Sequence, residues 1–173
     1  TQCADIEVPL DHSAPDDGTI RLFVRKFPAQ APRKGQFWLV AGGPGESGAS
    51  FYPFIETLRD AAPGFDLIVP DHRGTGFSTR LCPVEESAES EGGSALAGKE
   101  WATCFAALNA KADRTKAFNI TNAARDLDML MSRFGSDGRT YLYGVSYGTQ
   151  LVLRMLTLAD DVAIDGVILD SLV

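Results

Sequence analysis

Short apolar stretches alternate with amphipathic ones along most of this chain. Residues 5–10 and 19–27 alternate between hydrophobic and polar positions, as strands with one buried face do, and a turn-rich segment at 11–18 separates them. Almost continuously apolar runs at 36–41 and 65–70 predict strands buried on both faces of a sheet. The chain therefore opens with an antiparallel strand pair and continues into the interior of a sheet.

Apolar residues at helical spacing separate the later strands. They predict a helix over 51–62 and a second helix behind an N-cap at Thr121, which Gly135 closes. A strand then follows at 140–145 and a helix at 148–159. The last element is a strand at 164–173, which we expect to be buried on both faces. Strand and helix alternate from residue 36 onward, which predicts an α/β fold with a mostly parallel sheet and helices on both faces.

Residues 81–119 interrupt this alternation. Residues 84–98 are rich in Glu, Ser, Gly and Ala and predict a solvated loop, whereas 99–111 favour a helix. The whole chain of 173 residues has the length of one domain. We therefore expect residues 1–173 to form part of a single domain from which 81–119 is an excursion.

The charge balance excludes several classes of partner. The chain carries 16 Lys and Arg against 23 Asp and Glu, a net charge of −7 without a basic cluster, so nucleic acid is not expected as a partner. Its apolar runs fall far short of the roughly 18–20 residues of a membrane span. Its two histidines, His12 and His72, are far apart and no CxxC pair occurs, so we expect neither a metal nor another cofactor.

The sharpest chemical signal is the sequence GVSYG at 144–148, between a predicted strand and a predicted helix. In this context G-x-S-x-G forms a tight turn that exposes the serine hydroxyl above the sheet. The helix N-terminus behind it favours developing negative charge. The pattern identifies Ser146 as a candidate nucleophile, although the motif also occurs by chance in unrelated turns.

A second glycine-rich turn, GGPG at 42–45, follows the strand at 36–41. Glycines allow backbone N–H groups to approach the oxyanion that forms in acyl transfer. The same region also matches G-x-G-x-x-G at 43–48, with Asp71 ending the next strand, which is the outline of a dinucleotide-binding site. We keep that alternative, although it leaves the GVSYG motif unexplained.

The two turns, together with DHRGTGFS at 71–78, occur in the order and spacing that resemble α/β-hydrolase peptidases of the prolyl aminopeptidase and secreted tripeptidyl aminopeptidase type. The resemblance implies an α/β-hydrolase fold with Ser146 as nucleophile. It implies that the backbone N–H groups of Gly43 and Tyr147 form the oxyanion hole. It also places Asp71 and Arg73 in a turn that braces the oxyanion loop through charge-assisted hydrogen bonds.

The family's other catalytic groups are not found in this chain. The triad order in this fold is Ser, then an acid, then His, and none of the 27 residues after Ser146 is a histidine. The resemblance implies that the acid, the base, the last strands and a specificity cap lie in a second polypeptide segment. With it, we expect a serine exopeptidase that cleaves peptides from the N-terminus; an esterase or an inactive binding module of the same fold are the alternatives.

The three cysteines predict one crosslink. Cys82 and Cys104 bracket the loop at 84–98, which has little apolar surface to bury, and a disulfide there would stabilise it; two buried thiols are the alternative. Cys3 would then be left for a cysteine elsewhere. A disulfide indicates an extracellular or periplasmic protein, with its signal peptide already absent.

Overall fold

The computed structural model describes residues 1–93, 95–135, 138–159 and 163–173. Within these ranges six strands form one sheet in the order β1-β2-β4-β3-β5-β6. Their bounds are β1 Gln2–Pro9, β2 Thr19–Phe27, β3 Gly35–Val40, β4 Phe65–Pro70, β5 Arg139–Val145 and β6 Gly166–Asp170. β1 and β2 pair antiparallel, as do β2 and β4, and the remaining pairs are parallel. The predicted antiparallel opening and mostly parallel sheet are confirmed.

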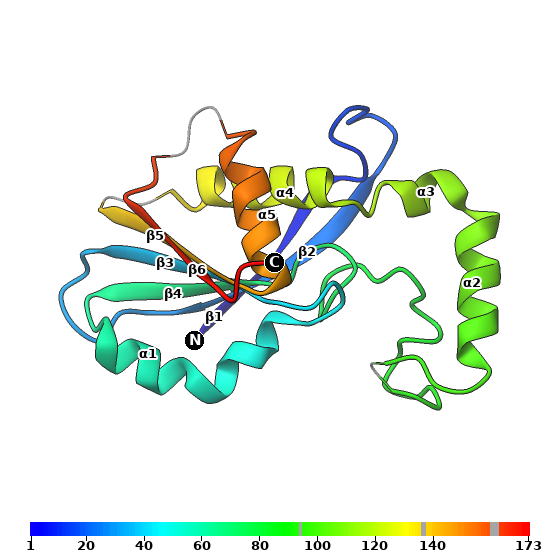
Figure 1. The fold of residues 1–173 in the computed structure, drawn as a ribbon, viewed down its shortest axis with the longest axis horizontal. Helices are drawn as coiled ribbons and strands as arrows, with labels where there is room; N and C mark the ends of the chain where they lie inside the picture. The colour runs from blue at the N-terminus through cyan, green and yellow to red at the C-terminus, as the bar shows by residue number, and fades with distance from the viewer. Residues whose placement is uncertain (94, 136–137, 160–162) are drawn as a thin grey trace.

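Helices cover both faces of the sheet (Figure 1). On one face lie α4 (Ile120–Arg133) and α5 (Tyr147–Leu156), and on the other lie the 3-10 helix η1 (Gly48–Phe54) and α1 (Ile55–Ala61). The core under α4 and α5 contains the fully buried Trp38, Leu142 and Met155. The carboxyl ends of the parallel strands thus emerge at one edge, where the candidate motifs lie.

Two helix boundaries differ from the prediction for local reasons. The helix expected from residue 51 begins at Gly48 as a 3-10 turn, because the Ser47 side chain caps it by accepting a hydrogen bond from the Ala49 N–H. Helix α4 is capped by Asn119 and not by Thr121, because the Asn119 carboxamide accepts from the Asn122 N–H. An amide side chain two residues earlier therefore takes the capping position.

The last strand, β6, is shorter and less buried than predicted. Val167 and Leu169 pack against the core beneath α5, but Ile168 on the opposite face is 47% exposed. The prediction of a strand buried on both faces was wrong. On the second face η1 and α1 pack over β3 and β4, so the outer side of β6 has no cover among the described residues.

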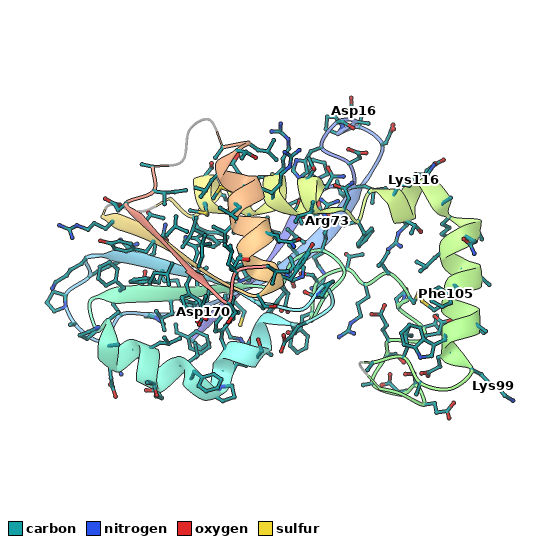
Figure 2. The ribbon with its side chains drawn as sticks, viewed as in Figure 1. Asp16, Arg73, Lys99, Phe105, Lys116 and Asp170 are labelled. Atoms are coloured by element: carbon teal, nitrogen blue, oxygen red, sulfur yellow. A yellow bond between two sulfur atoms is a disulfide. The ribbon has the colours of Figure 1, made fainter. Side chains whose placement is uncertain are left out.

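Residues 81–119 project from the sheet as an arm (Figures 1 and 2). The arm contains α2 (Glu100–Ala110) and a short α3 (Ala112–Lys116), the latter not predicted from the sequence. Helix α2 is apolar on nearly all sides, yet only Cys104 is buried, and Trp101 and Phe105 are about half exposed. A helix apolar all round is normally enclosed by other structure.

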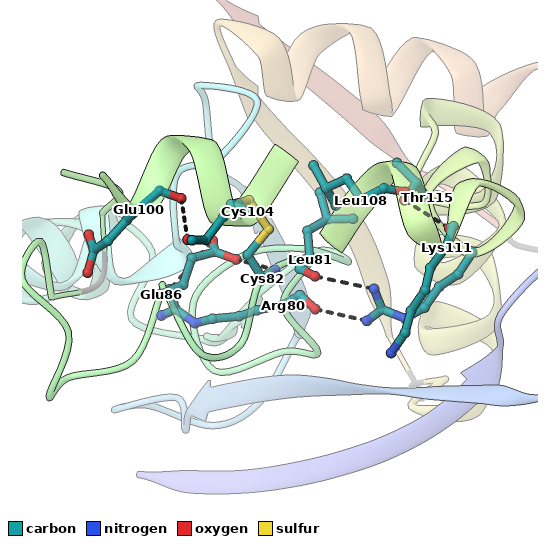
Figure 3. The surroundings of a disulfide bond; sticks show 11 residues. Arg80, Leu81, Cys82, Glu86, Glu100, Cys104, Leu108, Lys111 and Thr115 are labelled. Atoms are coloured by element: carbon teal, nitrogen blue, oxygen red, sulfur yellow. Dashed lines mark hydrogen bonds and ion pairs between the residues drawn. A yellow bond between two sulfur atoms is a disulfide. The ribbon is translucent and has the colours of Figure 1, made fainter. Parts of the chain in front are cut away.

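A crosslink and polar contacts hold the segments of the arm to one another and to its base at Arg80 (Figure 3). Cys82 and Cys104 form the predicted disulfide, with their Cα atoms 5.5 Å apart. The Arg114 guanidinium donates to the carbonyl oxygens of Leu81 and Arg80 at 3.4 and 2.9 Å. Cys3 is an exposed free thiol. Nowhere in the described ranges is a helix long and apolar enough to cross a membrane.

Candidate active site

Ser146 lies at the turn between β5 and α5, in a strained conformation. Its backbone has φ +51° and ψ −123°, which residues other than glycine rarely adopt. The turn is fixed on both sides: the Ser146 N–H donates to the Asp170 carbonyl at 2.9 Å, and the Thr149 N–H and hydroxyl donate to the Ser146 carbonyl at 2.8 and 2.7 Å. These contacts hold a serine on a sharp strand-to-helix turn.

The two glycines of this turn are required by close backbone contacts. A Cβ atom on Gly144 would lie 2.7 Å from the Gly148 carbonyl oxygen, and one on Gly148 would lie 2.3 Å from the Val40 carbonyl oxygen. No side chain fits at either position. The spacing G-x-S-x-G therefore lets α5 start directly against the end of β3, with Ser146 at the apex.

The loop at 42–45 packs against the same turn. A Cβ on Gly42 would lie 3.1 Å from the Ser146 Cβ and 2.9 Å from the Val145 carbonyl oxygen. Gly43 follows with φ +53°, and Tyr147 is the first residue of α5. The structure thus brings together Gly43, Ser146 and Tyr147, which the sequence singles out, just beyond the carboxyl ends of the adjacent strands β3 and β5.

Asp71 ties the loop after β3 to the turn after β4. One oxygen, Oδ1, accepts from the Gly48 N–H at 2.7 Å and the Ser47 hydroxyl at 2.8 Å, and Oδ2 accepts from the Phe77 N–H at 2.8 Å. This is the bracing role expected for Asp71. It also contradicts the dinucleotide alternative, because the Gly48 N–H and the Asp71 carboxylate already bind each other instead of a phosphate and a ribose.

Arg73 has a different role from the one expected. Its Nε and Nη2 each donate to the Asp126 carboxylate at 2.7 Å, and its Nη1 donates to the carbonyls of Leu10 and Ala117 at 2.6 and 2.9 Å. The His12 Nε2 lies 2.8 Å from the same carboxylate. The prediction that Arg73 braces the oxyanion loop was therefore wrong, because it joins the turn after β1 to α4. Figure 2 labels Arg73 among these elements.

Both histidines contact other side chains. His12 is bound to Asp126, and His72 is 9% exposed with its ring 5.8 Å from the ring of Tyr147. Burial lowers the pKa of His72, although the nearby carboxylates of Asp71 and Asp126 act in the opposite direction. Among the residues that the structure describes, none makes a hydrogen bond with the Ser146 hydroxyl.

An open groove of about 520 Å³ runs beside the site along β5. Its lining includes Glu46, Phe51, Phe54, Tyr143 and Val145. At one side the Tyr143 hydroxyl donates to the Asp170 carboxylate at 2.6 Å; burial and this carboxylate raise the pKa of Tyr143 to about 12. Sequence reasoning missed the pair, because it depends on β6 lying next to β5.

Residues 37–172 match the family model described as alpha/beta hydrolase fold. The chain belongs to this family. It is 30% identical over 165 residues to the serine protease Hip1 of Mycobacterium tuberculosis, covering 86% of this chain and 32% of that protein. It is also 30% identical over 195 residues to the tripeptidyl aminopeptidase of Streptomyces coelicolor, covering 99% and 35%. The chain thus spans about a third of the length of these curated relatives.

Solved structures agree on the fold. A proline iminopeptidase-related protein from Thermus thermophilus superposes with a TM-score of 0.55 at 19% identity, covering 98% of this chain and 44% of that one. A thermophilic esterase from Thermogutta terrifontis gives 0.57 at 20% identity, covering 96% and 44%. At these identities the likeness concerns the fold alone. The expected α/β-hydrolase fold is confirmed.

Proposed function

We propose that this chain carries the nucleophile of a serine exopeptidase that cleaves peptides from the N-terminus through an acyl-Ser146 intermediate. The observation that carries the proposal is the strained turn at Ser146, held between β5 and α5 with the loop at 42–45 packed against it. Strained backbone of this kind clusters at active sites, ligand clamps and switch regions. Relatives named as a serine protease and a tripeptidyl aminopeptidase support a peptide substrate.

In the proposed reaction, the Ser146 oxygen attacks the carbonyl carbon of the scissile peptide bond while a base accepts the hydroxyl proton. The backbone N–H groups of Gly43 and Tyr147 hold the resulting oxyanion. The C–N bond then breaks, and the base returns the proton to the leaving amine. Water, deprotonated by the same base, attacks the acyl ester, which releases the N-terminal unit and restores Ser146.

The base and its orienting acid are proposed to come from a second polypeptide segment that also carries the specificity cap. His12 is bound to Asp126, and His72 is buried with its ring against that of Tyr147; neither makes a hydrogen bond with the Ser146 hydroxyl in the described residues. Surfaces that need cover support the same proposal. They are the groove along β5, the exposed Ile168 of β6 and the apolar helix α2.

The proposed location is extracellular or periplasmic. The disulfide between Cys82 and Cys104 supports it, because disulfides persist in oxidising compartments and are rare in the cytosol. A fluorescent fusion followed by cell fractionation tests it. Recovery of the protein in the cytosol with both cysteines reduced contradicts this location.

Ser146→Ala tests the nucleophile in the catalytically competent protein. We expect fluorophosphonate labelling to disappear and peptide turnover to fall by about three orders of magnitude or more, with an unchanged circular dichroism spectrum. The matched control is Ser171→Ala, which removes a second serine hydroxyl at positive φ close to Asp170. Turnover of amino-acid esters without peptides supports the esterase alternative, and undiminished activity in Ser146→Ala refutes the proposal.

Expression of residues 1–173 alone tests the need for a second segment. We expect no peptidase turnover and a tendency to associate through the uncovered β6 edge and α2. Size-exclusion chromatography and a peptide-release assay measure both properties. A soluble monomer with full turnover contradicts the proposal, since the base would then lie within these residues.

A further inference from the structure

Glu46 places a carboxylate beside the proposed oxyanion hole. A Cβ atom on Gly43 would lie 3.3 Å from the Glu46 Oε2 and 3.1 Å from the Glu46 Cβ. A Cβ atom stands about 2.5 Å from the nitrogen of its own residue, so this carboxylate oxygen is within about 6 Å of the Gly43 nitrogen. The same side chain lines the groove along β5 together with Val145, the residue directly before Ser146. The carboxylate therefore lies close to the proposed position of the substrate carbonyl.

The Glu46 side chain has no partner in the described ranges. The backbone closes the turn that contains it, because the Glu46 N–H donates to the Gly43 carbonyl at 3.2 Å. The side chain is exposed and forms neither a hydrogen bond nor an ion pair with a described residue. By contrast, the Asp71 carboxylate after the next strand accepts three hydrogen bonds. The charge of Glu46 is thus available to a ligand.

An unpaired carboxylate at this position influences acyl transfer through its charge. The tetrahedral intermediate carries negative charge on the oxygen that the Gly43 N–H is proposed to hold, and a second negative charge nearby raises its energy. A substrate that brings a positive charge to the same place neutralises the carboxylate and removes this penalty. Glu46 therefore discriminates between substrates by the charge next to their scissile carbonyl.

We propose that Glu46 is a specificity-determining residue that binds the free α-ammonium group of the residue whose carbonyl Ser146 attacks. The proposal rests on the proposed function, since it concerns the substrate of the same site. In an N-terminal residue the amine nitrogen is about 2.5 Å from the carbonyl carbon, within reach of a carboxylate beside the oxyanion hole. A free amine two residues further along would lie about 7 Å farther away. Glu46 thus favours the release of a single N-terminal residue.

The test compares alanyl p-nitroanilide with its N-acetyl derivative in the catalytically competent protein. The two substrates share the scissile bond, the leaving group and the side chain, and they differ in the charge of the amine. The ratio of kcat/KM for the free over the acetylated substrate therefore reports on ammonium recognition and not on folding or on the amount of active protein. Alanyl and N-acetylalanyl methyl esters give the same ratio if the protein hydrolyses esters in preference to amides.

Variants of Glu46 should fold, because the side chain is exposed. Glu46→Gln removes the charge and should lower the ratio roughly 10- to 100-fold, and Glu46→Lys should lower it further. Both variants should hydrolyse the acetylated substrate faster than the parent protein does, because the charge that opposes its oxyanion is gone. Glu56→Gln is the matched control: it removes an exposed carboxylate that pairs with Arg59 on α1 and should leave the ratio unchanged.

The pH dependence of the ratio gives a second readout. An α-amino group loses its proton near pH 8, so the ratio in the parent protein should fall as the pH rises through about 8. In Glu46→Gln the ratio should depend less on pH, because no carboxylate then prefers the ammonium form. Loss of packing at this position would not change the pH dependence in this way.

An unchanged ratio in Glu46→Gln overturns the proposal, as does an equal drop in Glu56→Gln; if Glu46→Gln does not fold, Glu46→Lys decides in the same way. Trialanyl p-nitroanilide should lose little kcat/KM in Glu46→Gln, because its ammonium lies beyond the reach of Glu46. Cleavage of this substrate alone, with none of the alanyl substrates hydrolysed by the parent protein, also overturns the proposal.

Ser146→Ala separates the two proposals. Turnover that survives this substitution, or the absence of turnover of all these substrates in the parent protein, refutes the proposed function and with it the role of Glu46. Loss of turnover in Ser146→Ala, together with an unchanged ratio in the Glu46 variants, refutes only the recognition of the ammonium group.

Discussion

Removal of the Asp126 carboxylate should destabilise the protein more than most single substitutions. Asp126 and Arg73 are both almost fully buried, and the carboxylate accepts two hydrogen bonds of 2.7 Å from Arg73 and a contact of 2.8 Å from His12. In Asp126→Ala the guanidinium stays buried, and its remaining acceptors among the described residues are the carbonyls of Pro9, Leu10 and Ala117. The Arg73 charge would then be buried without its counter-ion, and this is the largest loss in the free energy of unfolding.

We expect Asp126→Ala to lower the free energy of unfolding by about 3–5 kcal/mol. A domain of this kind has a total stability of roughly 5–15 kcal/mol, so the loss is a large fraction of it. Urea unfolding followed by tryptophan fluorescence, to which the buried Trp38 contributes, measures the change as a shift in the midpoint at constant slope. His12 should also become more accessible, because it loses the same partner.

A double variant isolates the pairing. Arg73→Met combined with Asp126→Leu removes both charges and should lie within about 2 kcal/mol of the parent protein, well above the single variant. Asp113→Ala is the control, because the Asp113 side chain is 99% exposed and pairs with Lys116 on the surface; it should not move the midpoint measurably. A loss below about 1 kcal/mol in Asp126→Ala refutes the reasoning that the charge is trapped.

Three other contacts lead to predictions of their own. Replacement of Cys82 and Cys104 by serine should cost about 3 kcal/mol in the chain-entropy picture and make the arm the first site of proteolysis, measured by limited digestion and mass spectrometry. Gly76→Ala should reduce the yield of folded protein, because its Cβ would lie 2.1 Å from the Asp71 carboxylate at φ +52°; a normal yield and Tm would contradict this. Burial raises the pKa of Asp66, but hydrogen bonds from Lys26 and Arg33 outweigh this effect, so the net pKa is lowered. The stability that Asp66 contributes should therefore be present above about pH 4 and be lost as the pH falls further. Asp66→Asn should flatten that acid limb in urea titrations, and an unchanged limb would contradict the assignment.

Sequence reasoning succeeded where the signal is local. The strands at 19–27 and 65–70 have the predicted bounds, and the turn at Ser146 follows from steric demands within five residues. The disulfide was predictable because Cys82 and Cys104 bracket a segment with little to bury. The residues that determine the two strands and the turn lie close together in the sequence. The two cysteines are identified by the loop that they flank.

It failed where the decisive partner is distant. Arg73 and Asp71 stand two residues apart in one motif, yet Arg73 binds Asp126, 53 residues away, and no local pattern indicates that pairing. The burial of β6 depends on which helices pack on its two faces. The apolar run at 167–169 predicted burial on both faces, but the described residues cover only one. The contact of His72 with Tyr147 likewise requires knowledge of how β4 and α5 approach each other.

The Asp71 carboxylate has a consequence for the motion of the site. It accepts hydrogen bonds from the backbone N–H groups of Gly48, after β3, and Phe77, after β4, at the same time. Either loop can therefore open only by breaking its hydrogen bond to the carboxylate, while the other loop remains bound to it. The two segments should therefore open as one cooperative unit, and their amide protons should exchange with solvent at matching rates. A substrate that contacts either loop would then slow exchange in both.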